Sequence, residues 1–241
     1  MTLLAIDIGN TTITCGIFKD EILSSRNDFK KFVDFEKYLI KNIKYIDKVL
    51  LSSVVPEKTQ QCKQIITNIE LIIIDSALSN LPLLVETPES VGADRLCNIK
   101  AAIELYELPC IVIDFGTAIT YDVVNNNKEF IGGVIAPGVE TSAEYLINKA
   151  ALLTSPELKF PNKVIGINTI QNIQSGIMFG AIDQVYGMIN RITKETKLDY
   201  SIILTGGISK KISTQFSQKH IVDINLTLKG ILFIYKSTLS L

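Results

Sequence analysis

One short pattern occurs twice in this chain of 241 residues, and it constrains the possible fold more than any other feature. Residues 3–11 read LLAIDIGNT and residues 110–118 read CIVIDFGTA, so each apolar run leads into Asp-x-Gly and then a polar residue. The two aspartates, Asp7 and Asp114, are 107 positions apart (114 − 7), close to half the chain. A repeat at this distance predicts two similar lobes, each opening with a β-hairpin.

Strand-like and helix-like segments follow one another in both halves, which predicts an α/β protein with mixed sheets. Strands are expected over 2–8, 13–18, 48–54, 71–74, 110–114, 119–124, 130–135 and 201–205. Helices are expected over 34–45, 57–68, 93–107, 139–150, 169–196 and 226–238. We expect the boundary near Pro109, giving an N-terminal lobe of residues 1–109 and a C-terminal lobe of residues 110–241.

The composition excludes several classes of protein. The 24 Lys and Arg residues are scattered and matched by 25 Asp and Glu residues, unlike the clustered basic face of a nucleic-acid-binding protein. The apolar runs are far shorter than the roughly 20 residues of a membrane span, and the N-terminus lacks the features of a signal peptide. We therefore expect a cytoplasmic protein that binds neither nucleic acid nor membrane.

The cysteines and the histidine offer little chemistry. Cys15, Cys62, Cys97 and Cys110 form no C-x-x-C pair, so we expect four idle, buried thiols rather than a zinc site. The only histidine, His220, stands beside no nucleophile motif, which argues against histidine-dependent catalysis.

The first Asp-x-Gly motif has the composition of a phosphate-binding turn. Gly9 lets backbone N–H groups approach phosphate oxygens, and Asn10, Thr11 and Thr12 can add donors. Asp7 would repel phosphate unless Mg²⁺ or its bound water lay between them. The alternative is an ordinary hairpin turn. The second motif, with Asp114 and Thr117, favours the phosphate interpretation, because two such loops across a cleft between the lobes could clamp the phosphates of ATP.

Residues 91–95, VGADR, stand at the start of the amphipathic segment 93–107, at a helix N-terminus that favours anions. Arg95 could bind a substrate carboxylate in a bidentate manner, and Asp94 could accept a proton from an attacking hydroxyl. The alternative is an ordinary first turn with an Asp beside an Arg.

Two glycine-rich segments follow strands. Residues 132–138, GGVIAPG, could line a substrate pocket or simply connect a strand to a helix. At Gly206 and Gly207 an adenine or ribose could lie against bare backbone, although two glycines after a strand are common.

Taken together, these motifs resemble those of the type III pantothenate kinases, in the superfamily of sugar and acetate kinases, heat-shock chaperone ATPases and actin. The resemblance extends over residues 7–11, 53–56, 92–95, 114–120, 132–138, 165–169, 175–176, 205–207 and 228–230. The segments 92–95 and 132–138 are the most specific to this family. One position departs from it, because Ile119 stands where the family has Thr; strand alternation predicts that Ile119 faces the core, opposite to Thr120.

The resemblance implies two ribonuclease H-like lobes with the active site in the interlobe cleft. It also implies transfer of the γ-phosphoryl group of ATP to the 4′-hydroxyl of pantothenate, the first step of coenzyme A biosynthesis. Asp94 is then the proton acceptor, and Asp114 the ligand of a monovalent cation, K⁺ or NH₄⁺, needed besides Mg²⁺. The implied pantothenate contacts are Gly92, Ala93, Asp94, Arg95 and Thr169, and the implied ATP contacts are Asp7, Ile8, Gly9, Asn10, Thr11, Thr12, Ile13, Thr14 and Thr117.

The family is homodimeric, with substrate bound near the subunit interface, so a homodimer is implied here too. Two other functions fit the same fold: a non-catalytic ATP-binding regulator, and a kinase for another small hydroxyl substrate. The presence of Asp7, Asp94 and Asp114 argues against a decayed site, and residues 92–95 argue against a different substrate.

Overall fold

The computed structural model describes residues 1–150 and 156–239. The chain forms two compact units. The first contains Met1–Tyr106, Glu129–Ile131 and the described residues from Asn225 onward, and the second contains Glu107–Lys128 and the described part of Gly132–Ile224.

The first unit is built on a five-stranded mixed sheet with the order β3-β2-β1-β4-β5. Its strands are β1 (Thr2–Ile8), β2 (Ile13–Lys19), β3 (Ile22–Phe29), β4 (Lys48–Ser53) and β5 (Glu70–Ile73). The strands β1, β2 and β3 pair antiparallel, whereas β1, β4 and β5 pair parallel. Alternate residues of the central strand β1 therefore enter two different cores.

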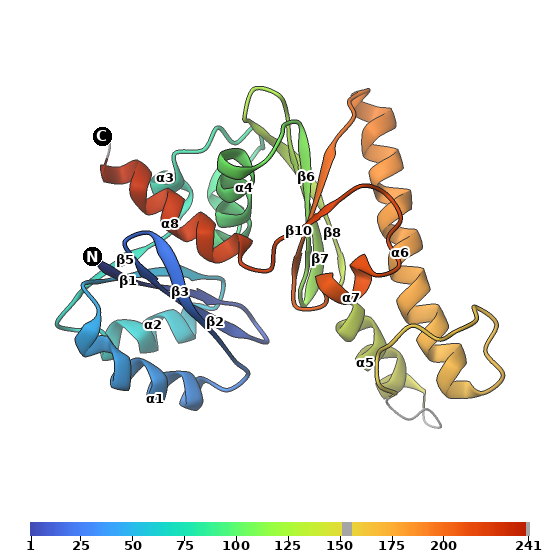
Figure 1. Cartoon of the computed structure of the whole chain (residues 1–241), viewed down its shortest axis with the longest axis horizontal. Helices are drawn as coiled ribbons and strands as arrows, with labels where there is room; N and C mark the ends of the chain where they lie inside the picture. The colour runs from blue at the N-terminus through green and yellow to red at the C-terminus, as the bar shows by residue number, and fades with distance from the viewer. Residues whose placement is uncertain (151–155, 240–241) are drawn as a thin grey trace. The chain divides into compact units, whose positions relative to one another are not determined.

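Helices cover both faces of this sheet (Figure 1). The core on one face joins Leu4 and Ile6 to α1 (Phe32–Asn42) and α2 (Pro56–Ile65). The core on the other joins Leu3 and Ala5 to α4 (Ala93–Leu105) and α8 (Leu226–Leu239). The shorter elements of this unit are η1 (Ile43–Tyr45), α3 (Ser76–Ser79) and η2 (Pro88–Ser90).

The second unit has a sheet with the order β10-β9-β6-β7-β8. Its strands are β6 (Cys110–Phe115), β7 (Ala118–Val124), β8 (Phe130–Pro137, whose first two residues belong to the first unit), β9 (Ser201–Gly206) and β10 (Ile221–Val222). Its helices are α5 (Val139–Lys149), α6 (Thr169–Thr196) and α7 (Ser209–Ser213). The apolar stripe expected along α6 is buried at Ile173, Ala181 and Val185, whereas Ile170 at its start is 48% exposed.

The two sheets confirm the internal repeat. In each, the first strand is central, the second pairs with it antiparallel and the fourth pairs with it parallel. Asp7 and Asp114 occupy the last position but one of the equivalent strands β1 and β6. The predicted class, α/β with two similar mixed sheets flanked by helices, is confirmed.

The C-terminal helix α8 lies in the first unit, although the expected lobe of residues 110–241 included it. Its buried face, with Leu228, Ile231 and Tyr235, packs in the same core as Leu96 and Cys97 of α4. A contiguous boundary at Pro109 therefore does not describe these units, because the chain returns to the first core to bury this face.

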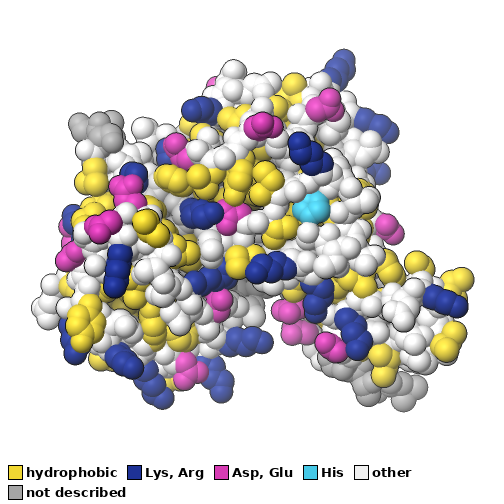
Figure 2. All heavy atoms as spheres, in the orientation of Figure 1, with side chains coloured by type: hydrophobic (Ala, Val, Ile, Leu, Met, Phe, Trp, Pro, Cys, Tyr) yellow, Lys and Arg dark blue, Asp and Glu magenta, His cyan; other side chains and the backbone are white. Residues whose placement is uncertain are grey.

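The surface carries interspersed basic and acidic side chains on the face seen in Figure 2. All four cysteines are buried and unpaired, as predicted. His220 Nδ1 donates a hydrogen bond to the Gln218 carbonyl, and His220 Nε2 shares one with Ser213 Oγ, each at 2.7 Å. Among the described residues, no helix is long and apolar enough to cross a membrane.

Candidate active site

The first phosphate motif forms the tight turn between β1 and β2. The Gly9 N–H donates to the Thr12 carbonyl oxygen at 3.0 Å, which closes the turn. Asp7, just before it, pairs in register with Ser52 of β4, whose buried hydroxyl donates to Asp7 Oδ1 at 2.8 Å. The carboxylate is therefore held near the C-terminal end of the central strand β1, where the turn begins.

The residues of this segment that are proposed to contact ATP differ in their exposure to solvent. Asn10 and Thr11 are exposed at the turn, whereas the side chains of Ile8 and Ile13 are buried, so only their backbone could reach a ligand. The Thr14 hydroxyl donates to Asp28 Oδ1 at 2.7 Å, which ties it to β3.

Asp94 lies at the start of α4, where Gly92 is the N-cap residue. Its Oδ1 accepts a hydrogen bond from the Arg95 backbone N–H at 2.8 Å. Burial raises the pKa of the Asp94 carboxyl above its usual value, and this hydrogen bond and the charge of Arg95 only partly oppose the rise. A carboxylate with a raised pKa is a better proton acceptor, as a general base requires.

The charges of Asp7 and Asp94 both act on the buried thiol of Cys97 in the first unit. Burial raises the pKa of this thiol well above its usual value, and the charges of Asp7 and Asp94 raise it further. A hydrogen bond with Ser52 opposes the rise. Asp7 and the proposed base thus act on the same buried atom, although 87 positions (94 − 7) separate them in sequence.

Arg95 lies over an aromatic ring in the same unit. Its guanidinium carbon is 5.5 Å from the centre of the Phe130 ring, within the range of a cation–π interaction. Phe130 is itself held by the segment before α4, since its carbonyl accepts from the Leu84 N–H at 2.8 Å. A contact of this kind helps to position the guanidinium, whose planar set of donors matches a carboxylate.

The second motif places a carboxylate among hydroxyl groups. Asp114 of β6 pairs in register with Thr120 of β7 and with Thr205 of β9, so the three side chains share one face of the sheet. The Thr120 hydroxyl oxygen is buried without a hydrogen-bond partner. Gly206 follows with φ +91, and a β-carbon there would collide with the Asp114 carboxylate.

Residues 132–138 brace the second phosphate motif. The Gly138 N–H donates to the Thr117 carbonyl at 3.0 Å, and the Thr141 hydroxyl donates to the same oxygen at 2.7 Å. A β-carbon on Gly138 would collide with the backbone of Gly116 and Thr117. These contacts support the loop that carries Thr117, and the lining of a substrate pocket by this segment stays a prediction.

Thr169 lies in the second unit, at the first position of α6. Its side chain is exposed and lines an open hollow of about 660 Å³ with Pro156, Glu157, Lys159 and Gln174. The N-terminus of α6 is capped by Asn168, whose Oδ1 accepts from the Gln171 N–H at 2.9 Å. Thr169 and Gly92–Arg95, the residues expected to contact pantothenate, thus belong to different units.

Comparison with known proteins decides the family. The family model described as "Type III pantothenate kinase" matches residues 3–191. The chain belongs to the type III pantothenate kinase family. This confirms the resemblance carried by the sequence motifs.

Relatives in the family match along almost their whole length. The chain is 38% identical to the type III pantothenate kinase of Halalkalibacterium halodurans over 250 residues, which cover 97% of this chain and 98% of the relative. It is 40% identical to that of a Sulfurihydrogenibium species over 251 residues, 97% of this chain and 99% of the relative. A putative Baf family transcriptional activator from Campylobacter jejuni shares the fold, with a TM-score of 0.70 at 18% identity and coverage of 99% and 100%.

The departure from the family at Ile119 leaves the second phosphate motif intact. The Ile119 side chain is 1% exposed, so it faces the core as strand alternation predicts. It pairs with Phe115 at the end of β6, whereas Thr120 pairs with Asp114. Replacement of Thr by Ile at a fully buried position adds apolar packing and removes no exposed donor.

Two residues that contact the first motif of this type III pantothenate kinase were not predicted from its sequence. Ser52 holds Asp7, and the Lys58 ammonium donates to the carbonyl oxygens of Gly9 and Asn10, each at 3.3 Å. Neither residue belongs to a recognisable local pattern. The one available signal was the position of Lys58 in the first turn of a helix, where a positive charge is unfavourable.

The acidic residues fit a magnesium ion held mainly by phosphate and water. Over residues 1–150 and 156–239 no group of three or more His, Cys, Asp or Glu side chains could hold a metal ion. Mg²⁺ typically binds one or two carboxylates, substrate phosphates and several waters. Asp7, at the edge of the phosphate turn, suits that arrangement.

Proposed function

We propose that this protein transfers the γ-phosphoryl group of ATP to the 4′-hydroxyl of pantothenate, the first step of coenzyme A biosynthesis. The observation that carries this proposal is the identity of 38–40% with type III pantothenate kinases over 97% of the chain. The position of Asp94 within the first unit supports the same chemistry.

Asp94 is the proposed general base. The oxygen of the 4′-hydroxyl attacks the γ-phosphorus, the bond from that phosphorus to the β,γ-bridging oxygen breaks, and ADP leaves with the bond electrons. The hydroxyl proton passes to the Asp94 carboxylate. No residue becomes phosphorylated, because phosphoryl transfer depends on positioning and charge stabilisation rather than covalent help.

The two phosphate motifs are the proposed ATP-binding elements. The turn after Asp7 and the loop with Thr117 offer backbone N–H groups and hydroxyls to phosphates, and Gly206–Gly207 would lie beside the adenosine. A β-carbon at Gly207 would meet nothing within 4 Å, so the backbone there is open to a flat ligand. Gly92, Ala93 and Arg95 would contact pantothenate at the N-terminus of α4, with Arg95 on its carboxylate.

Asp114 is the proposed ligand of a monovalent cation, K⁺ or NH₄⁺. The orphaned Thr120 hydroxyl oxygen beside it supports this assignment, because an unpartnered buried oxygen is a ready ligand for a hard cation. Asp7 would hold Mg²⁺ directly or through water. When bound, the cations would neutralise charge on the phosphates of ATP.

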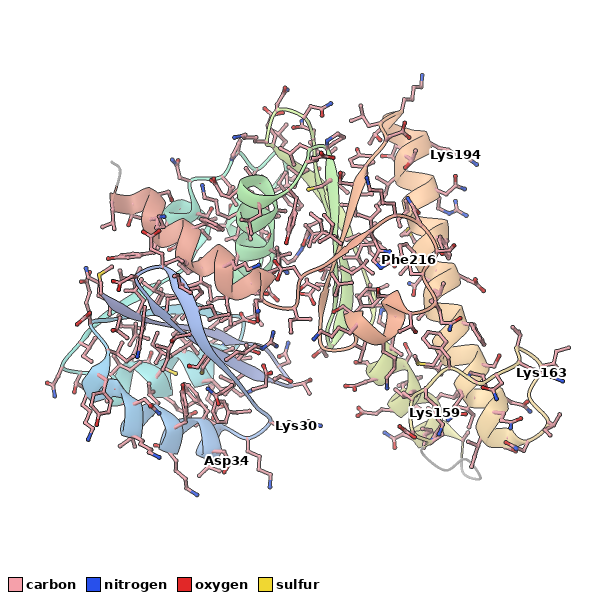
Figure 3. All side chains as sticks on the ribbon, viewed as in Figure 1. Lys30, Asp34, Lys159, Lys163, Lys194 and Phe216 are labelled. Atoms are coloured by element: carbon pink, nitrogen blue, oxygen red, sulfur yellow. The ribbon has the colours of Figure 1, made fainter. Side chains whose placement is uncertain are left out.

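We also propose a cytoplasmic homodimer. The free, buried cysteines suit a reducing compartment. The segment before α6 exposes apolar side chains: Val164, Ile165 and Ile167 are 66%, 84% and 88% exposed. This segment belongs to the loop that carries Lys163 (Figure 3) and leads to Thr169, which favours a subunit interface beside the substrate.

The kinase proposal is tested by ADP release from MgATP, with and without pantothenate, in K⁺ and in Na⁺ buffer. Release that needs both pantothenate and K⁺ supports the substrate and the cation together. Asp94→Asn should lower kcat by roughly 10²–10⁴ while nucleotide still binds. Folded protein that binds ATP but releases no ADP would contradict the kinase proposal and favour a regulator, and near-normal kcat for the variant would exclude Asp94 as the base.

The dimer proposal is tested by light scattering on the wild type and on Ile165→Asp/Ile167→Asp. We expect a dimer of the wild type and a monomer of the variant, with a raised KM for pantothenate. A wild-type monomer would contradict it.

A further inference from the structure

Lys58 reaches from α2 to the backbone of the first phosphate turn. Its ammonium donates to the Gly9 and Asn10 carbonyl oxygens, both at 3.3 Å. The side chain is half-buried, in contrast to Lys63 on the same helix, which is exposed. Two adjacent carbonyls of one turn therefore share a single cationic donor.

The charge of Lys58 stands where a helix disfavours it. The helix α2 begins at Pro56, so Lys58 is its third residue and lies in the first turn. The helix dipole places partial positive charge there, and a cation at such a site is destabilising. The two carbonyl oxygens offset this repulsion, because they offer negative partial charge to the ammonium.

The geometry of the peptide bond gives the contact a second consequence. In a trans peptide, the carbonyl of one residue and the N–H of the next point in opposite directions. The carbonyls of Gly9 and Asn10 point toward Lys58, so the N–H groups of Asn10 and Thr11 point away from it. Lys58 thereby sets the direction of two donors in the turn proposed to bind phosphate.

We infer that Lys58 is a positioning residue for the phosphates of the nucleotide. It holds two peptide planes so that their N–H groups face the phosphates, and it polarises both peptide groups by bonding to their oxygens. This inference rests on the proposed function only in that the ligand of the turn is a nucleoside triphosphate. It does not require pantothenate to be the acceptor.

The test is nucleotide binding to the full-length protein without pantothenate. Dissociation constants of a non-hydrolysable ATP analogue and of adenosine are measured by calorimetry or by competition, for the wild type, Lys58→Met, Lys58→Arg and the matched control Lys63→Met. Lys58→Met should weaken binding of the ATP analogue about tenfold or more, since hydrogen bonds of a charged group are lost. Adenosine, which has no phosphates, should bind all four proteins alike, and Lys58→Arg should retain part of the affinity.

Two results would overturn the inference. Unchanged binding of the ATP analogue to Lys58→Met would show that the turn is oriented without Lys58, and an equal loss of adenosine binding would show a general structural role. Because pantothenate is absent, failure of the kinase proposal would leave this result interpretable. In turnover assays of an active enzyme, Lys58→Met should raise KM for ATP more than KM for pantothenate.

Discussion

A β-carbon placed on Gly92 would lie 2.6 Å from Oδ1 of Asp94 and 3.4 Å from a methyl carbon of Val54. The backbone of Gly92 has φ −57, which any residue can adopt, so glycine is needed here for space and not for conformation. The residue that caps α4 thus determines where the proposed base can stand.

Gly92→Ala should therefore impair catalysis with little effect on the fold. The colliding atom is the end of a side chain, so the Asp94 carboxylate can move aside while the backbone stays in place. We expect kcat to fall by about 10²-fold, the effect of a misplaced reacting group, with Tm nearly unchanged. Steady-state kinetics and thermal unfolding measure both. Gly176→Ala, where a β-carbon meets nothing within 4 Å, is the control and should be fully active.

Burial of the ionised Asp94 carboxylate costs stability, and this cost should appear when the stabilities of the wild type and of Asp94→Asn are compared across pH. Folding raises the pKa of Asp94, so the ionised form is disfavoured in the folded protein. As the pH rises from the usual carboxyl pKa through the raised one, the wild type loses stability that the variant keeps. We expect the variant to have the higher Tm at neutral pH and the difference to vanish below about pH 4. A difference that grows toward acid pH would contradict the burial argument.

Asp114→Ala should weaken or abolish activation by K⁺, measured as the ratio of kcat in K⁺ and Na⁺ buffers. Thr120→Val is the sharper variant, because the hydroxyl it removes is buried without a hydrogen-bond partner. Loss of such a group is neutral or stabilising for the fold. We expect Tm to be retained and the K⁺ concentration that gives half-maximal activity to rise. Unchanged K⁺ dependence in both variants would place the cation elsewhere.

Gly230→Ala should destabilise the protein. A β-carbon on Gly230 of α8 would collide with the backbone carbonyl of Cys97 in α4, so the two helices would have to separate. Overpacking of this kind costs about 1–3 kcal/mol, which exceeds the gain of about 1 kcal/mol from a better helix former. Denaturant unfolding measures the change. Gly180→Ala in α6 meets nothing within 4 Å and should be neutral or slightly stabilising.

The regular elements were largely predictable from the sequence, because long apolar periodicity survives in them. The helix predicted over 169–196 has these bounds in the structure, and the strand predicted over 2–8 is β1. The strand Ile22–Phe29 was missed, since its residues are largely polar and only partly buried. The strand Ile221–Val222 was missed because two residues carry no periodicity.

Residues of the proposed site could be predicted where they belong to a short contiguous motif. Residues 92–95 do stand at a helix N-terminus, and Ile119 is buried as alternation predicts. Ser52 and Lys58 could not be found this way. Each acts on the first motif from an element more than 40 positions along the chain, through a single hydrogen-bonding group.

The sequence by itself determined the repeated sheet, the family and the residue types available for phosphoryl transfer, because these depend on local periodicity and on contiguous motifs. Only the tertiary structure decided that α8 returns to the first unit, that Ser52 bonds to Asp7, and that Lys58 bonds to the carbonyls of Gly9 and Asn10. These relationships join residues far apart in the chain. They depend on which apolar faces are buried together, and burial is a property of the whole packed core rather than of any segment.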